Sequence, residues 1–172
     1  MANDTTQKRS EWLILSDTHS NTDRVRRVFS LCAPVDGILF LGDGEQDMEA
    51  LQQQYPALPI VGVRGNCDFF SRLPVARVCT VAGHTLWLTH GHAYGVKGGT
   101  ARLEAAAFEI GADAVLFGHT HHATEQTVVS ADGRRLNLFN PGSLGYPDDG
   151  RPRFGRLTAD EKGLLFSTGT LD

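Results

Sequence analysis

Residues 12–43, WLILSDTHSNTDRVRRVFSLCAPVDGILFLGD, contain the pattern that decides the fold: two short apolar runs with an amphipathic segment between them. The runs at residues 12–16 and 37–41 show no polar alternation, which is typical of strands that are covered on both faces. Between them, residues 23–32 place apolar side chains at helical spacing, with Thr22 or Asp23 as the expected N-cap. The stretch therefore predicts a β-α-β unit with parallel strands and a right-handed crossover.

The same alternation continues outward from this unit and then changes character. A helix at residues 45–55 and a strand at 59–63 extend the parallel sheet. The elements expected after them are strands at 75–81, 84–89, 112–117, 124–129 and 135–139, a helix at 100–110, and two strands around 160–163. Tight turns at Ala82-Gly83 and Asp132-Gly133 make several of these strands antiparallel. We predict an α/β fold in which two mixed β-sheets pack as a sandwich flanked by α-helices.

Composition limits the classes of protein that the chain can belong to. With 172 residues, 41% hydrophobic and 21% charged, it has the size and balance of one globular domain, residues 1–172, behind a flexible polar tail at 1–10. A net charge of −4 argues against sequence-specific nucleic-acid binding and against an acidic membrane as partner. The three cysteines form no CxxC pair, and no apolar run approaches the ~20 residues of a membrane span. We therefore expect a cytoplasmic protein with reduced thiols.

Polar side chains with metal-binding capacity follow one predicted strand after another. In chain order they are Asp17 and His19, then Asp43, then Asn66 and Asp68, then His90 and His92, then His119, His121 and His122. The carboxyl ends of the strands in an α/β sheet form its usual ligand crevice, so these residues are expected at one rim. Taken singly, an aspartate after a strand is more often an N-cap or turn residue. Five strand ends in succession favour a metal site instead.

The ligand types indicate which ions would bind. His119 and His121 occupy alternate positions at a strand end and are expected to point to the same side. Carboxylate oxygens mixed with imidazole nitrogens, without clustered thiolates, suit Mn²⁺ best, with Fe²⁺, Zn²⁺ or Ni²⁺ as alternatives. Seven of the residues given above would be too many ligands for one ion. They would make two sites if one carboxylate bridged them, with the ions about 3.5–4 Å apart.

The order of these motifs resembles that of the calcineurin-like metallophosphoesterases. The matching motifs are Asp17-x-His19, Gly42-Asp43, Gly65-Asn66-x-Asp68, His90 and Gly118-His119-x-His121, and the resemblance extends from about residue 12 to residue 168. The short chain, the variant Gly65-Asn66-Cys67-Asp68 and the segment Asn140-Pro141-Gly142-Ser143 are similar to the small bacterial and archaeal phosphodiesterases of the YfcE-like group. That group is related to a scaffold subunit of the eukaryotic retromer.

The resemblance implies which of the motif residues would bind each metal ion. One ion would be held by Asp17, His19 and His121. The other would be held by Asn66, His90 and His119, with Asp43 bridging the two, so that Asp43, Asn66 and His90 carry the catalysis. A hydroxide between the ions would attack phosphorus in line, because divalent ions lower the pKa of water by several units.

Six further residues are expected to contact substrate: Arg64, Cys67, Asp68, His92, Asn140 and Ser143. Cys67 stands where the larger phosphatases of the family carry a histidine, which puts activity on poor leaving groups in doubt. The expected substrate is a phosphodiester, either a small molecule or a nucleotide-like compound. Two alternatives stay open: a metal-binding scaffold of the same fold, and a phosphomonoesterase. An exposed edge at residues 73–81, or one among the C-terminal strands, could pair with a second copy into a homodimer or homotetramer.

Overall fold

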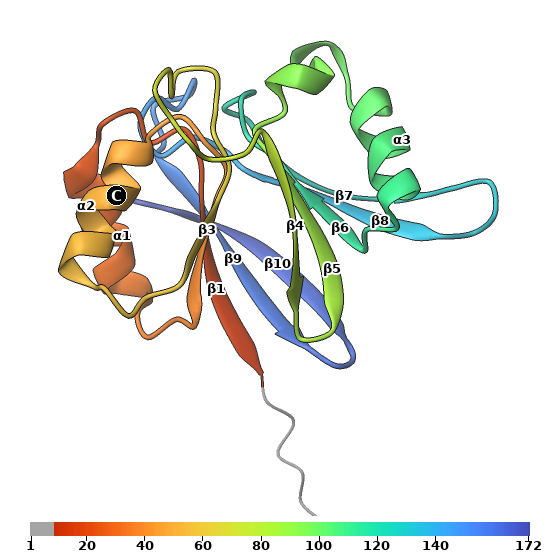
Figure 1. Ribbon diagram of the computed structural model, residues 1–172, viewed down its shortest axis with the longest axis horizontal. Coiled ribbons are helices and arrows are strands. Elements are labelled where there is room, and N and C mark those ends of the chain that lie inside the picture. Colours follow the sequence, from red (N-terminus) through yellow and green to blue (C-terminus); the bar gives the residue numbers. More distant parts are fainter. Residues whose placement is uncertain (1–8) are drawn as a thin grey trace, which may run out of the picture.

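The computed structural model describes residues 9–172, and residues 1–8 lie outside the described part of the chain. The predicted tail at 1–10 therefore falls mostly outside it, and the first strand begins at Ser10. Two five-stranded mixed sheets face each other, with helices on the outer side of each (Figure 1). This confirms the predicted sandwich.

The first sheet contains the β-α-β unit predicted within residues 12–43. Its strands, in spatial order, are β10 (Gly163–Thr170), β9 (Arg153–Asp160), β1 (Ser10–Leu15), β2 (Gly37–Phe40) and β3 (Ile60–Gly62). The three strands β1, β2 and β3 are parallel, and β9 adds to β1 in the antiparallel sense. Two helices cover the outer face, α1 (Thr22–Cys32) and α2 (Glu45–Gln54).

The second sheet has the order β4, β5, β6, β8, β7. The bounds are β4 (Ala76–Val81), β5 (His84–Thr89), β6 (Ala114–Leu116), β7 (Ala123–Val129) and β8 (Arg135–Pro141). Its central strands β5, β6 and β8 are parallel, and the outer two are antiparallel to their neighbours. Helix α3 (Ala101–Ile110) covers its outer face, after two short 3-10 turns, η1 (His92–Tyr94) and η2 (Val96–Gly98).

The unbroken apolar run of β1 follows from burial on both faces. Leu13 and Leu15 pack in the cluster beneath α1 and α2, whereas Ile14 points between the sheets. The same alternation places Ile38 beneath the helices and Leu39 between the sheets. Because both faces are apolar, the period-2 pattern of a half-buried strand never appears in the sequence.

The N-cap of the first helix, predicted at Thr22 or Asp23, lies one position before Thr22 in the structure. Asn21 occupies the N-cap position of α1 and makes no side-chain capping hydrogen bond. The Thr22 hydroxyl instead donates to the buried carboxylate of Asp47 on α2, over 2.6 Å. This bond ties the start of α1 to the first turn of α2.

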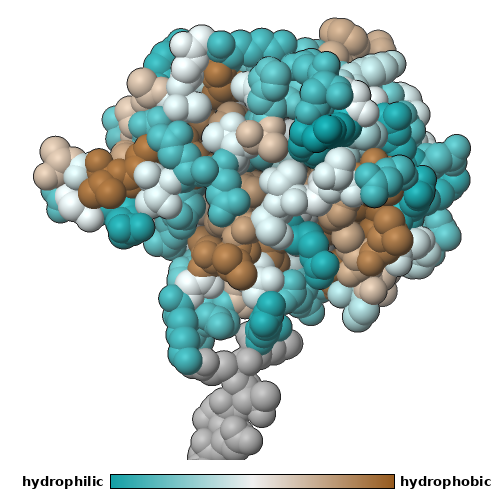
Figure 2. All heavy atoms as spheres, turned by 180° about the vertical axis from the view of Figure 1, so that it is seen from behind, coloured by the Kyte–Doolittle hydropathy of each residue, from teal (hydrophilic) through white to brown (hydrophobic). Residues whose placement is uncertain are grey.

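The face of the molecule that points away from the viewer in Figure 1 is largely hydrophilic. Figure 2 shows its brown, apolar residues in separate small groups rather than in one continuous patch. Across residues 9–172, no helix is long and apolar enough to cross a bilayer.

Candidate metal centre

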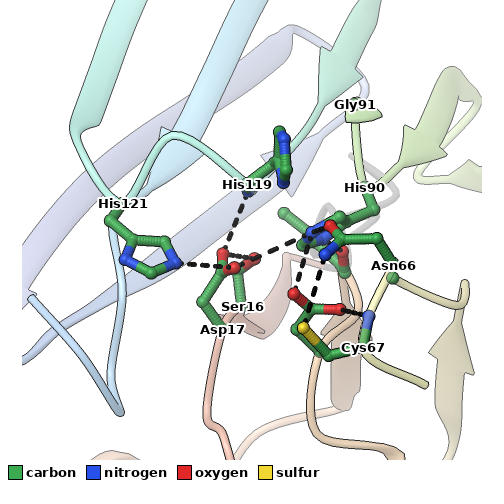
Figure 3. A network of polar contacts seen from close by, with 12 residues as sticks. Ser16, Asp17, Asn66, Cys67, His90, Gly91, His119 and His121 are labelled. Carbon is green, nitrogen blue, oxygen red and sulfur yellow. Dashed lines mark hydrogen bonds and ion pairs between the residues drawn. The ribbon is translucent and has the colours of Figure 1, made fainter. Parts of the chain in front are cut away.

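Loops from both sheets converge at one edge of the sandwich and carry the predicted ligands (Figure 3). Asp17 and His19 follow β1, Asp43 follows β2, and Asn66 follows β3. From the second sheet come His90 after β5 and the segment from His119 to His121 after β6. The Nδ1 atom of His90 lies 2.7 Å from the carbonyl oxygen of Leu41, so the ends of the two sheets are in direct contact.

The backbone of these loops is unusual. Of the seven non-glycine residues with positive φ between residues 9 and 172, five are predicted ligands: Asp17 (52°), His19 (45°), Asp43 (60°), His119 (67°) and His121 (61°). Each such residue costs about 1–2 kcal/mol, and strain of this kind clusters at functional sites. The sequence analysis expected strand alternation to point His119 and His121 to the same side. That reason is wrong, because β6 ends at Leu116 and both residues lie beyond it in a loop with positive φ.

The two carboxylates are each held at one oxygen and left open at the other. The Asp17 Oδ2 atom accepts from the Ser16 hydroxyl (2.5 Å) and from the His119 backbone N–H (3.1 Å). The Asp43 Oδ1 atom accepts from the Cys67 backbone N–H (2.7 Å). Both remaining oxygens point toward the histidine rings, so the protein fixes the direction in which each carboxylate offers its free oxygen.

Imidazole nitrogens surround the free oxygens. The Asp17 Oδ1 atom lies 3.2 Å from His121 Nε2 and 3.8 Å from the Nε2 atoms of both His19 and His90. The Asp43 Oδ2 atom lies 3.3 Å from His90 Nε2 and 4.0 Å from His19 Nε2. Asp17 is fully buried and Asp43 nearly so.

Two of these atoms lack the hydrogen bonds that buried polar atoms normally make. Asp17 Oδ1 and His19 Nε2 are inaccessible and have no hydrogen-bond partner among residues 9–172. Nine-tenths or more of buried polar groups make hydrogen bonds, so two buried atoms without one, 3.8 Å apart, are suited to binding a cation. Asp17, His19 and His121 form one cluster with metal-ligand spacing, and Asp17, Asp43 and His90 form another.

The tautomer of His90 supports the same interpretation. A carbonyl oxygen can only accept, so the Nδ1–H of His90 donates to Leu41 and the Nε2 lone pair faces the centre. There it lies 3.1 Å from Asn66 Oδ1 and 3.3 Å from Asp43 Oδ2, both acceptors. Although burial lowers the pKa of His90, the two aspartates raise it overall. The aspartates therefore favour a positive charge at the position where a metal would lie.

The neighbouring histidines differ from His90 in the direction of their pKa shifts. Burial, together with His90, lowers the pKa of His119 to about 4, and burial also lowers that of His92. The shifts favour the neutral ring in both residues, the form in which imidazole binds metals. The His119 ring lies edge-on to His90, with ring centroids 5.1 Å apart.

Three residues expected to contact substrate make hydrogen bonds that support the fold. Asp68 accepts four backbone N–H bonds, from Asp43 and Gly65 at Oδ2 and from Gly44 and Glu45 at Oδ1, over 2.8–3.1 Å. It therefore clamps the second motif loop to the third. Its oxygens are thus already bonded to the backbone, and a contact between Asp68 and substrate stays a prediction.

Asn140 and Ser143 are buried and likewise engaged with the backbone. The Asn140 amide donates to the Gly118 carbonyl, and the Ser143 hydroxyl donates to the Asp17 carbonyl (2.9 Å) while accepting from the Tyr146 N–H. Both side chains hold in place the loops that carry the predicted ligands. Both side chains are buried, so their contact with substrate gains no support from the structure and stays a prediction.

The Ser143→Ala variant tests whether Ser143 supports the fold or contacts substrate. Its loss of two hydrogen bonds should lower the free energy of unfolding by about 1–2 kcal/mol, since a typical buried bond contributes about 1 kcal/mol. The Michaelis constant for any substrate should stay within about twofold of the wild-type value, within the scatter expected of a residue that makes no substrate contact. Urea unfolding and steady-state kinetics measure the two quantities, and a selective rise in KM with unchanged stability would support the contact with substrate.

Cys67, Arg64 and His92 lie where a substrate could reach them. Cys67 and Arg64 are exposed, and His92 is half-buried beside His90, with ring centroids 5.5 Å apart. Burial and the carboxylate of Asp43 raise the pKa of the Cys67 thiol to about 11. A thiol that stays protonated at neutral pH is a poor nucleophile, which argues against a covalent mechanism through Cys67. His122 is exposed and pairs with Asp148 at the rim.

Two features escaped the sequence analysis. Asp47, buried at the start of α2, accepts hydrogen bonds from Thr18 (2.5 Å) and Thr22 and so holds the loop that carries His19. The second is a hollow beside the centre that is lined in part by the exposed rings of Phe69 and Phe70. Two adjacent phenylalanines directly after a polar motif were the available signal.

The chain matches known proteins over most of its length. Residues 11–162 match the profile of the calcineurin-like phosphoesterase superfamily domain. A probable metallophosphoesterase of Bacillus subtilis, YsnB, is 33% identical over 137 residues, which are 78% of this chain and 75% of the relative. The phosphodiesterase YfcE of Escherichia coli K12 is 27% identical over 172 residues, covering 86% of this chain and 87% of YfcE.

Solved structures show the same fold. A Streptococcus pneumoniae TIGR4 protein described as a predicted phosphoesterase superposes with a TM-score of 0.77 at 23% identity, over 95% of this chain and 90% of that one. Vps29 of Chaetomium thermophilum superposes with a TM-score of 0.68 at 19% identity, over 94% and 95% of the two chains.

Proposed function

The chain belongs to the calcineurin-like phosphoesterase superfamily, and from that membership and the site geometry we propose that it is a phosphodiesterase dependent on two divalent metal ions. The observation that carries the proposal is the buried Asp17 Oδ1 atom, which makes no hydrogen bond to any of residues 9–172 and lies within 3.8 Å of three imidazole nitrogens. A cation bound among these three ring nitrogens would give this carboxylate oxygen a partner. The name of the relative YfcE supports the choice of a diester as substrate.

We assign the ligands in two sets. Asp17, His19 and His121 form a spatial cluster that would hold the first ion. Asn66, His90 and His119 would hold the second, with Asp43 between the two sets; His90 and Asn66 lie 3.1 Å apart, and the His119 ring lies beside His90. The mixture of carboxylate, amide and imidazole ligands suits Mn²⁺.

Ions bound there would lower the pKa of a water molecule and offset the negative charge of the phosphate. The remaining work is done by the chain itself. Ser16, the His119 N–H and the Cys67 N–H fix the two carboxylates before any ligand arrives, and the Leu41 carbonyl fixes the His90 ring. Such preorganisation avoids the cost of reorienting dipoles as water attacks phosphorus in line with the leaving oxygen.

Metal removal tests the proposal. Protein stripped of metal should hydrolyse neither bis-p-nitrophenyl phosphate nor p-nitrophenyl phosphate, and added Mn²⁺ should restore turnover of the diester in preference to the monoester, because the metals supply the nucleophile. Preference for the monoester would instead identify a phosphomonoesterase. Absence of turnover with any divalent ion, in folded protein that still binds two metals, would favour the scaffold alternative.

A further inference from the structure

A hollow of about 670 Å³ opens directly beside the candidate metal centre. Its lining includes His19, Asp43 and Cys67 from the candidate centre, together with Phe69 and Phe70. Its volume lies in the range of small-molecule sites, about 300–1,000 Å³. A group attached to a phosphate at the centre would therefore have room to extend into it.

The two phenylalanines are far more exposed than aromatic side chains normally are. Phe69 is 81% exposed and Phe70 fully exposed, on the loop between β3 and β4, which arches over the edge of the sandwich in olive in Figure 1. Leaving such a ring in water forgoes about 1.5–3 kcal/mol of burial. Adjacent exposed apolar side chains at the mouth of a site are typical of a binding surface.

The charges around the hollow restrict what can bind there. Besides Asp43 and Asp68 from the motif loops, the carboxylates of Glu45 and Glu49 line it from α2, against the single guanidinium of Arg72. A second phosphate would be repelled by these carboxylates. A neutral group that donates hydrogen bonds, through hydroxyls or amino groups, would find acceptors.

We propose, on the basis of the proposed function, that this hollow binds a nucleoside as one of the two substituents of the phosphodiester. The base stacks on Phe69 or Phe70, the sugar hydroxyls and base amino groups face Glu45 and Glu49, and the phosphate lies at the metal centre. A nucleoside combines the three properties that the hollow selects: an aromatic face, hydrogen-bond donors and no charge. The substrates are thus nucleotide phosphodiesters with no further phosphate on the nucleoside in the hollow.

Binding of AMP and of methyl phosphate to the Mn²⁺-loaded protein tests this proposal. The two monoesters carry the same charge and differ only in the substituent. By isothermal titration calorimetry, AMP should bind the wild type about 5- to 100-fold more tightly, the range expected for stacking one base on an aromatic ring. In the double variant Phe69→Ala with Phe70→Ala, that advantage should disappear while the affinity for methyl phosphate stays unchanged.

Two further variants make the result decisive. Phe70→Trp should keep the preference for AMP, because tryptophan retains a stacking surface, and Leu165→Ala, at an exposed apolar residue on β10, should keep it as well. Equal affinities of the wild type for the two ligands would overturn the proposal and leave the proposed function standing, since diester hydrolysis is measured separately. A double variant that keeps the AMP preference but sediments as a smaller species would also overturn it, and would make the phenylalanines a contact between copies.

Discussion

The Asp43→Asn variant should lose at least about a hundredfold in turnover of a phosphodiester and bind less than two metal ions per chain. Changes to residues that only support a ligand already cost about 10–100-fold, and Asp43 is assigned between both ions. Its Oδ2 atom lies 3.3 Å from His90 Nε2 and 4.0 Å from His19 Nε2. An amide there would carry no negative charge and would present an N–H₂ group to His90, occupying the lone pair that a metal needs.

The fold of this variant should survive, which makes the loss interpretable. The amide oxygen can still accept the Cys67 N–H that now bonds to Asp43 Oδ1. Bound metal is measured by elemental analysis of gel-filtered protein, and Asp23→Asn, which removes an exposed carboxylate from the first turn of α1, is the matched control. Two ions and near-wild-type turnover in the Asp43→Asn protein would rule out Asp43 as the shared ligand.

The fold could be predicted because its apolar pattern is strong and local. Continuous runs such as residues 37–41 require cover on both faces, and the helical spacing of residues 23–32 provides the cover on one of them. The ligand set could be proposed because parallel strands bring their carboxyl ends to one edge, so residues from Asp17 to His121 meet although more than 100 positions separate them.

What the sequence left unresolved is how each polar atom is used. Asp68, Asn140 and Ser143 stand in or beside the motifs, and a motif gives no sign that an oxygen is already bonded to a backbone N–H or carbonyl elsewhere. The partner of Ser143 is 126 positions away, on the loop that carries Asp17. The exposure of a side chain is equally hard to read from a sequence: the pair Phe69-Phe70 does not show whether its rings are buried, and only the path of the loop places both at the hollow.

The Asp68→Ala variant should be less stable than the wild type by about 2–4 kcal/mol and should lose activity with it. The carboxylate accepts four backbone N–H bonds that join Gly65 of the third motif to residues 43–45 of the second. Hydrogen bonds to a charged group contribute about 1.5–3 kcal/mol each when intact, but water can reach part of this half-buried site and replace some of them. For a chain of this size, each kcal/mol corresponds to about 2–4 °C in melting temperature.

Asp68→Asn separates the role of charge from that of shape. The asparagine oxygen can serve two of the four N–H donors, whereas its N–H₂ group would face the other two, donor against donor. The substitution is therefore expected to recover little of the stability lost in Asp68→Ala, even though the side chains of aspartate and asparagine are nearly the same size. Thermal melts of both variants, with bound Mn²⁺ measured in parallel, check this. If Asp68→Asn melted like the wild type and only its KM rose, Asp68 would be a substrate contact after all, and the clamp between the two loops would have to come from elsewhere.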